Sequence, residues 1–463
     1  MPGSTFAFSS SALRSLRLEE ELLERHKYVQ RRNRALQKTS SAPWLSRGLG
    51  HFTRRMDSQV CSDPLVQNAL FSGDLGEVQH FFSEDAPVNL IIEARGDELR
   101  WTSGELGLWS LTYEQELTTP LHITASRGYT DCLKHLLMHG ANVEFAPGGQ
   151  TPLQEACENG CTESVQLLLS FGANPNAVSD TGFTSLHYCK TPESISCAKL
   201  LLQYGASVNY LSEEEADTPL HIAARHGLEK HVRLLLRHGA AVNKKNKEEQ
   251  TPLNAACSQP HGSDHMDLYY KVCKELIENN ADIHTKDRDQ QHPLHLACKN
   301  ASSKVVEMLL ELGSNVNVMS YSGSTAMQYI LQNVAYKLEH RPENVVRALL
   351  NYGAVRIWPG ALIKVLTYCC SSPRTIEALM NTYDRVRATE DWEDAVPHEI
   401  QQRHPLFFES LFCLGQKPRS LQHLARYSVR LHLGGKLPHV LPQLPLPTTI
   451  RDFLMLRFED VLY

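Results

Sequence analysis

The sequence predicts an all-α fold, a solenoid of stacked helix-turn-helix units joined by turn-rich fingers. Two recurring signatures predict it. A Thr-Pro-Leu-His motif, or a variant of it, occurs seven times, beginning at Thr119, Thr151, Thr184, Thr218, Thr251, His292 and Thr325. A Gly-Ala pair follows the first four of these starts by 21 residues, at Gly140, Gly172, Gly205 and Gly239. A period of about 33 residues accommodates two short helices and a loop.

Each part of the repeat has a physical reason to begin or end a helix. The Thr-Pro pair begins the first helix, because proline is tolerated at the first helical position. The glycine of Gly-Ala ends the second helix, where the backbone must turn left-handed. Small residues such as Ala223 and Ala224 let the two helices pack closely. The apolar faces left above and below each pair are buried only when units stack, at roughly 25 cal/mol per Å².

Irregular spacings predict two insertions and atypical ends. The fifth unit runs 41 residues, which predicts an insertion between its helices at 258–267, and the last unit carries another at 337–343. Residues 63–118 are expected to form a divergent first repeat with a long finger at 83–116 that contains Trp101 and Trp109. The seven repeats occupy 119–355. Residues 356–400 are predicted to hold a capping helix pair, over 359–368 and 373–383.

The N-terminal segment, 1–62, is expected to contain a helix over 9–38 and then a flexible linker. Residues 1–56 hold 11 basic and 4 acidic side chains, whereas residues 57–400 hold 27 and 44. The basic stretch fits a nuclear-import patch or contact with an acidic partner, and it also fits a merely solvated helix. The acidic middle, with a net charge of −17, argues against nucleic acid as a ligand.

No signature of catalysis, metal binding or membrane insertion is present in the sequence. It contains no apolar run of about 18 residues and no signal peptide, so we expect a cytoplasmic protein without membrane contact, with nuclear access as an option through the basic segment. The cysteines lack the spacing of a zinc site or a disulfide framework and are predicted to be small core residues, such as Cys157, Cys257 and Cys298. No cofactor is predicted.

Four histidines occupy one position of the repeat and resemble a set of bases. They are His122, His187, His221 and His295. Because their position in the repeat is the same, we predict instead that they cap and brace neighbouring units through hydrogen bonds. Four aromatic residues lie on successive fingers and are candidate contacts for a protein substrate: Phe145, Phe183, Tyr210 and Tyr321. The alternative is that some of them pack on the adjacent finger.

The C-terminal stretch 418–447 predicts a short helix with a narrow apolar stripe. Leu421, Leu424, Ala425, Ser428 and Val429 recur at helical spacing. Pro418 and Ser420 are start signals, Gly434-Gly435 is a stop signal, and four prolines follow within ten residues. A helix this short is not stable alone, so its stripe must meet a partner.

These features together resemble a known family. The repeats at 119–355 resemble ankyrin repeats. Residues 401–463 resemble a SOCS box, because Ser420, Leu421, Ala425 and Val429 match its elongin-binding pattern and Leu444-Pro445-Leu446-Pro447 matches its cullin-selecting motif. The combination over about 64–463 resembles the ankyrin-repeat and SOCS-box family.

The resemblance implies a non-catalytic substrate receptor of a ubiquitin ligase. The residues implied in elongin C binding are Ser420, Leu421, Leu424, Ala425 and Val429, and elongin B would join through elongin C. The residues implied in selecting cullin-5 and its RING partner are Leu444, Pro445, Leu446 and Pro447. The ankyrin surface would hold a protein substrate of unknown identity. Ala425 stands where family members often carry Cys, which predicts somewhat weaker elongin affinity.

Three other functions were weighed against this hypothesis. In an ankyrin scaffold without a ligase role, Leu421 and Val429 would belong to an intramolecular core. An enzyme would need a catalytic constellation that the sequence does not offer. A nucleic-acid regulator would depend on the basic residues of 1–56.

Overall fold

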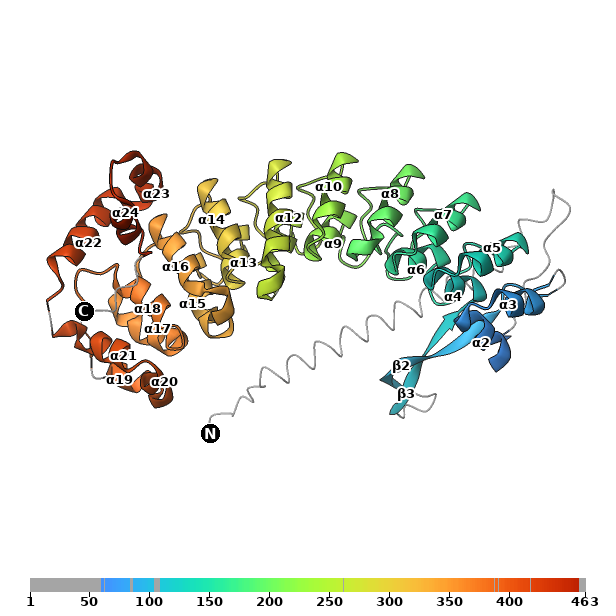
Figure 1. Cartoon of the computed structure of the whole chain (residues 1–463), viewed down its shortest axis with the longest axis horizontal. Coiled ribbons are helices and arrows are strands. Elements are labelled where there is room, and N and C mark those ends of the chain that lie inside the picture. Colours follow the sequence, from blue (N-terminus) through green and yellow to red (C-terminus); the bar gives the residue numbers. More distant parts are fainter. Residues whose placement is uncertain are drawn as a thin grey trace, which may run out of the picture. The chain divides into compact units, whose positions relative to one another are not determined.

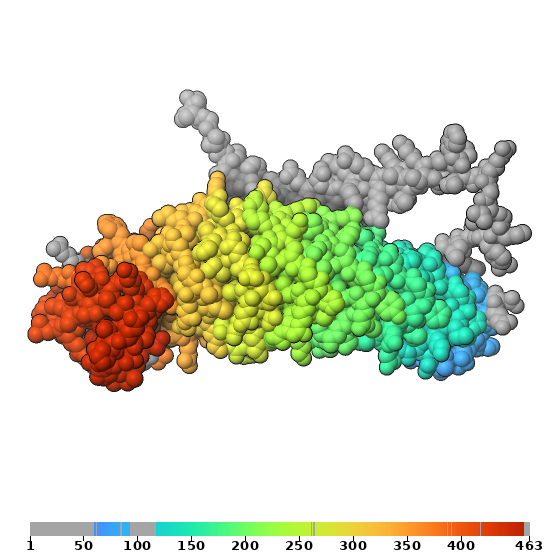
Figure 2. Space-filling view, turned by 90° about the horizontal axis from the view of Figure 1, so that it is seen from above, coloured from blue at the N-terminus to red at the C-terminus, as the bar shows by residue number. Residues whose placement is uncertain are grey.

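The chain divides into two units, Met1–Asp57 and Ser58–Tyr463. The structure is a computed structural model, and it describes residues 60–61, 63–83, 86–103, 109–260, 262–386, 388–389, 391–416 and 418–457. Within 93–103 and 109–116 it describes the backbone alone. The helix and linker predicted for 1–62 lie almost wholly outside these residues. The all-α solenoid predicted from the repeats is confirmed for the second unit, whose helix pairs follow one another in chain order (Figure 1). The colours of the described residues in Figure 2 follow the sequence in the same order.

Six of the seven units begin with a first helix. Where two neighbouring units both have one, their first helices pack side by side. These helices are α4 (Pro120–Ser126), α6 (Pro152–Glu158), α9 (Pro219–Arg225), α11 (Pro252–Ser258), α13 (Pro293–Lys299) and α15 (Ala326–Asn333). The second helices form the other layer, and they are α5 (Thr130–Met138), α7 (Thr162–Ser170), α8 (Ile195–Gln203), α10 (Glu229–Arg237), α12 (Met266–Glu278), α14 (Ser303–Glu311) and α16 (Pro342–Asn351).

Local capping determines where these helices begin and end. The Thr218 side chain accepts the backbone N–H of His221, and Pro219 occupies the first turn of α9. Gly140 and Gly172 follow α5 and α7 with φ of 82° and 90°, which confirms the left-handed glycine predicted after the second helix.

The third unit departs from the predicted helix pair. Its Thr184 is followed by a turn over 185–188, with no first α-helix, and then by a short 3-10 helix, η1 (Pro192–Ser194). Ser185 stands where most other units have a helix-initiating proline. Pro192 disfavours helical backbone at Thr191, whose φ and ψ are −119° and 154°. These two changes explain the missing helix.

The solenoid begins with the helices α2 (Pro64–Ser72) and α3 (Leu75–Phe81). The finger predicted at 83–116 is a β-hairpin, formed by β2 (Ile91–Ser103) and β3 (Trp109–Thr118), which pair antiparallel from Ile92 opposite Thr118 to Ser103 opposite Trp109. A short strand, β1 (Val60–Cys61), pairs parallel to β2. This hairpin is a local exception to the helical fold.

Three short 3-10 helices lie between the paired α-helices of these two units; the first and the third fall inside the predicted insertions, and the second directly precedes 337–343. They are η2 (Ser263–His265), η3 (Val334–Tyr336) and η4 (Leu338–His340). Beyond the repeats, η5 (Pro359–Ala361), α17 (Leu362–Cys369) and α18 (Pro373–Met380) pack on α15 and α16. The chain continues through α19 (Asp391–Asp394), α20 (His398–Arg403), α21 (Pro405–Phe412) and η6 (Cys413–Gly415), and Phe408 and Leu411 of α21 extend the core.

Buried side chains tie each unit to the next. The Nε2–H of His122 donates to the carbonyl of Gln150 in the following unit at 2.9 Å, and Nδ1 lies 2.7 Å from the Thr119 hydroxyl. His187, His221 and His295 make the equivalent contacts to the following finger, at 3.0–3.1 Å. This confirms that the repeated histidines cap and brace the units.

We expect these histidines to make the solenoid sensitive to acid. Burial lowers the pKa of His122, His187 and His295 to about 4 in the folded chain. The unfolded chain therefore binds more protons below its own histidine pKa of about 6.5, and stability is lost as pH falls from there toward 4. Each histidine should contribute about 1 kcal/mol of lost stability between pH 6.5 and 5.5.

The measurement is chemical unfolding at several pH values, with the triple variant His122→Gln, His187→Gln, His295→Gln as comparison. Gln154 already occupies this position in the second unit and completes the same capping box, so the variant keeps the cap and loses the titrating group. An equally steep loss of stability in the variant would contradict the assignment.

Candidate protein-protein interface

The C-terminal module begins with the helix that the sequence predicted. Its elements are α22 (Leu421–Leu433), η7 (Gly434–Lys436), α23 (Leu437–Val440), η8 (Leu441–Gln443) and α24 (Thr448–Leu454). The Ser420 hydroxyl caps α22 by accepting the backbone N–H of His423 at 3.2 Å. Gly434, with φ of 51°, ends it. The predicted start and stop signals are therefore confirmed.

The apolar stripe of α22 faces away from the rest of the chain. The side chain of Leu421 is 85% exposed, and those of Leu424 and Val429 are each 38% exposed. Ala425 and Ser428 are exposed as well. Sequence reasoning missed Leu431, which is 61% exposed on the same helix. The helix thus presents a row of apolar side chains to the solvent.

The opposite, polar face of α22 is the buried one. His423 and Arg426 are 5% and 2% exposed. The Nε2–H of His423 donates to the carbonyl of Tyr383 at 2.8 Å, and its Nδ1 accepts from Arg426 at 3.0 Å. The Arg426 guanidinium lies 4.2 Å from the centre of the Phe453 ring of α24. Burial lowers the pKa of His423 to about 4, so its neutral form makes these bonds.

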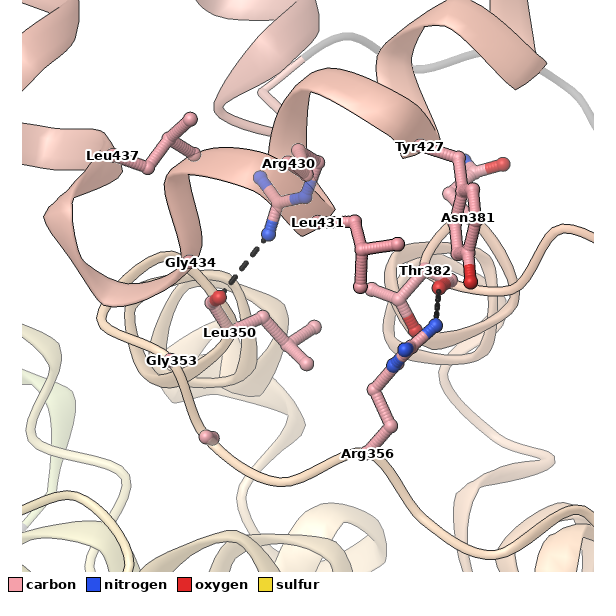
Figure 3. Close-up of a pocket in the computed structure, with 11 residues that line it drawn as sticks. Leu350, Gly353, Arg356, Asn381, Thr382, Tyr427, Arg430, Leu431, Gly434 and Leu437 are labelled. Carbon is pink, nitrogen blue, oxygen red and sulfur yellow. Dashed lines mark hydrogen bonds between the residues drawn. The ribbon is translucent and has the colours of Figure 1, made fainter.

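Arg430, one turn further along, joins the module to the last repeat (Figure 3). Its guanidinium donates to the Asn351 side-chain oxygen at 2.7 Å and to the carbonyls of Leu350 at 3.2 Å and Leu454 at 2.5 Å. The Asn351 amide in turn donates to the carbonyl of Met455 at 3.0 Å. Burial lowers the pKa of Arg430 to about 10, so it still carries its charge at neutral pH.

These carbonyls lie at the C-terminal ends of helices, where backbone oxygens lack intrahelical partners and the helix dipole favours a cation. Leu350 is the next-to-last residue of α16, and Leu454 is the last residue of α24. Arg419 makes the same kind of contact to the carbonyl of Met380, the last residue of α18, at 3.1 Å. Basic side chains therefore hold the module against two helix ends of the solenoid, those of α16 and α18, and Arg430 also binds the end of α24 inside the module.

Apolar contacts complete the attachment. Leu437, Leu441 and Leu454 form a small core inside the module. Leu456, 2% exposed, belongs to the solenoid core itself. The module is consequently continuous with the repeats and does not hang from a linker.

The predicted cullin-selecting segment is largely exposed. Leu444 is 38% exposed, Pro445 and Pro447 are exposed, and Leu446 packs partly against the module core. Leu444 and Pro447 have extended backbone, with ψ of 140° and 148°. The segment between η8 and α24 thus exposes two prolines and a leucine to solvent.

The four finger aromatics differ in exposure. Phe145 is half-buried. The Phe183 ring lies 5.5 Å from that of His187, and the Tyr210 ring lies 6.3 Å from it, edge-on. Both therefore contact the turn that replaces the first helix of the third unit. Tyr321 is 84% exposed and is the most exposed of the four.

Within the described ranges, no group of His, Cys, Asp and Glu side chains is arranged to hold a metal ion. No helix in that part of the chain is long and apolar enough to cross a membrane. The features that the structure does offer are contact surfaces on the solenoid and on the C-terminal module.

An ankyrin solenoid that ends in a SOCS box is the class of protein that this architecture defines. Residues 108–179, 186–287 and 265–357 match the family model of ankyrin repeats, and residues 417–455 match that of the SOCS box. The chain belongs to the ankyrin repeat and SOCS box family.

Several named members resemble it over most of their length. The chain is 41% identical over 459 residues to human Ankyrin repeat and SOCS box protein 16, with 99% of both chains covered. It is 46% identical over 407 residues to mouse Ankyrin repeat and SOCS box protein 10, covering 85% of this chain and 87% of that protein. Human Ankyrin repeat and SOCS box protein 18 is 39% identical over 412 residues, with 87% and 88% covered.

The arginine anchor yields a test of how the module is attached. Arg430→Met keeps much of the apolar stem of the side chain and removes its three hydrogen bonds, which should destabilise the attachment by about 2–3 kcal/mol. Hydrogen exchange of the full chain should show faster amide exchange in α22 and α24, with α4–α10 unchanged. Arg403→Met, at an exposed arginine of α20, is the control and should change neither region. Equal protection in both variants would show that Arg430 does not hold the module.

Proposed function

We propose that this chain is the substrate-recognition subunit of a RING ubiquitin ligase that contains elongin B, elongin C and cullin-5. Its membership of the ankyrin repeat and SOCS box family supports a substrate-recognition role. The observation that carries the proposal is the orientation of α22: its apolar stripe is exposed while its polar face is buried. A surface helix normally has the reverse orientation, so an external partner is required to cover the stripe.

Elongin C is the proposed partner of the stripe. Leu421 would be the main anchor, because burying an exposed leucine contributes about 1.5–3 kcal/mol. Leu424, Ala425 and Val429 would extend the same contact, and Ser420 caps the helix that presents them. Elongin B would join through elongin C. The exposed segment Leu444-Pro445-Leu446-Pro447 would contact cullin-5, which brings its own RING partner.

The solenoid is the proposed substrate surface. Tyr321, together with the exposed parts of Phe145, Phe183 and Tyr210, would contact a protein substrate there. The chain would supply no catalytic group of its own. Its contribution would be the raised effective concentration of the substrate near the ubiquitin-carrying enzyme.

The scaffold alternative fits the structure less well. It required Leu421 and Val429 to belong to an intramolecular core, and both side chains are exposed. The stack is also continued beyond its last repeat by α17, α18 and α21, so it does not need the stripe of α22 to close it. The nucleic-acid alternative depends on residues 1–56, which lie outside the described part of the chain.

Substitution of Leu421 tests the elongin contact. Leu421→Asp places a charge where an apolar pocket is expected, and we predict at least a hundredfold loss of affinity for the purified elongin B/C pair, on the order of 3 kcal/mol. Affinity is measured by calorimetry on the full chain. The control is Leu406→Asp, at a leucine of α21 that is 75% exposed, which should leave affinity unchanged. Retention of elongin B/C by Leu421→Asp would rule out the proposal.

Ala425 offers a test in the opposite direction. Ala425→Cys adds one buried sulfur to the proposed contact, and we expect roughly fourfold tighter elongin binding, from about 0.8 kcal/mol per methylene-sized group. The same calorimetric titration measures it, and Ser170→Cys, at an exposed position of α7, serves as the control and should leave the affinity unchanged. Weaker binding by Ala425→Cys than by the unmodified chain would show that position 425 has no room at the contact.

A further inference from the structure

A hollow lies between α6 and α9, and residues of the turn that replaces the first helix of the third unit line part of it. Its volume is about 290 Å³. Its walls include three rings and one aliphatic side chain, and an ion pair stands among its lining residues; these are Phe183, His187, Tyr188, Ile222, Glu158 and Lys190. The hollow exists because Ser185 and Pro192 prevent the helix that would otherwise fill this part of the row.

Tyr188 is held rigidly in the hollow. The ring is 4% exposed, and its hydroxyl donates to Ser179 at 3.1 Å and accepts from the Gln150 amide at 3.1 Å. Lys190 places its ammonium 5.6 Å from the ring centre of Tyr188 and 2.9 Å from a carboxylate oxygen of Glu158. A ring face beside a carboxylate is a site for a cation. The chain's own lysine occupies that site in this structure.

Glu158 is placed where it does not stabilise its own helix. It is the last residue of α6, and a carboxylate at a helix C-terminus is disfavoured by the helix dipole. The equivalent residues of α9 and α13 are Arg225 and Lys299, which the dipole favours. The carboxylate of Glu158 is therefore stabilised by a cation that lies outside its own helix.

The charged side chains around the hollow favour a positively charged ligand. Glu155 and Glu158 of α6, Asp180 of one finger and Glu213 of the next are acidic, and Glu213 packs against Gly182 beside the hollow. The histidines offer no opposing charge, because burial lowers the pKa of both His187 and His226, to about 4 for His187. Lys190 is the basic side chain of the lining, and its side chain is 36% exposed.

We propose that this hollow is a pocket for a basic side chain, arginine in preference to lysine, presented by the substrate protein. The proposal rests on the proposed function of the solenoid as the substrate surface. An arginine entering the hollow stacks on Tyr188 and pairs with Glu158 through two N–H groups, which a lysine does less well. The flexible Lys190 side chain leaves its place over the ring and turns to solvent.

The test uses the full chain bound to elongin B/C. A phage library of random 12-residue peptides is selected on it, and the enriched peptides are synthesised with each arginine also replaced by citrulline, which has the same shape and no charge. Fluorescence anisotropy measures affinities for the unmodified chain, Glu158→Gln and Lys190→Ala. Glu163→Gln and Lys199→Ala, at exposed positions of α7 and α8, are the matched controls.

We expect peptides rich in arginine, about tenfold weaker binding on citrulline replacement and on Glu158→Gln, and tighter binding by Lys190→Ala. The proposal is overturned by a selection that enriches no basic residue, by equal binding to Glu158→Gln, or by loss of binding in Lys190→Ala, which would indicate an anionic ligand. Elongin retention by each variant is recorded separately. Because Leu421→Asp should lose elongin and keep the peptide, failure of the pocket is distinguishable from failure of the ligase role.

Discussion

The architecture of the C-terminal half depends on the burial of arginine and histidine against helix ends. The stack is continued beyond its last repeat by α17, α18 and α21, and the polar side of α22 lies against the C-terminal ends of α16 and α18. The cost of desolvating Arg430 is offset because its donors meet the Asn351 amide oxygen and the carbonyls of Leu350 and Leu454 near helix ends. The apolar side of α22 is consequently exposed to solvent. With the opposite orientation, the apolar stripe of α22 would be buried against these helices.

The regular units of this solenoid and its irregular third unit have different structural consequences. The buried histidines, the threonine caps and the left-handed glycines repeat from unit to unit, and they produce a uniform stack with little surface character of its own. The third unit breaks the pattern through Ser185 and Pro192, and it produces a hollow with a ring, a carboxylate and a bound ammonium. The loss of one short helix lowers stability locally and creates a distinct recognition feature. Local departures from the rules of a repeat are expected to coincide with function.

The sequence alone predicted the elements whose cause is local. The period, the capping of α22 by Ser420 and the end of α5 at Gly140 follow from residue type and spacing, and the structure confirms them. It did not predict contacts made over long distances. Arg430 and Asn351 are 79 residues apart, and a polar face on a short helix is indistinguishable from a solvated one until its neighbours are known. The β-hairpin at 91–118 was also not predicted, because the repeat pattern assigns no conformation to a finger of that length.

Because Leu456 and Arg430 pack into the last repeat, the solenoid holds its units at fixed distances from the C-terminal module. Packed helices in neighbouring units lie about 10 Å apart, so four steps separate the third unit from the seventh by roughly 40 Å. The Leu456 and Arg430 contacts fix that separation relative to the C-terminal module. The number of units between a side chain bound at the third unit and the exposed leucines of α22 then determines which part of a bound protein lies near the module.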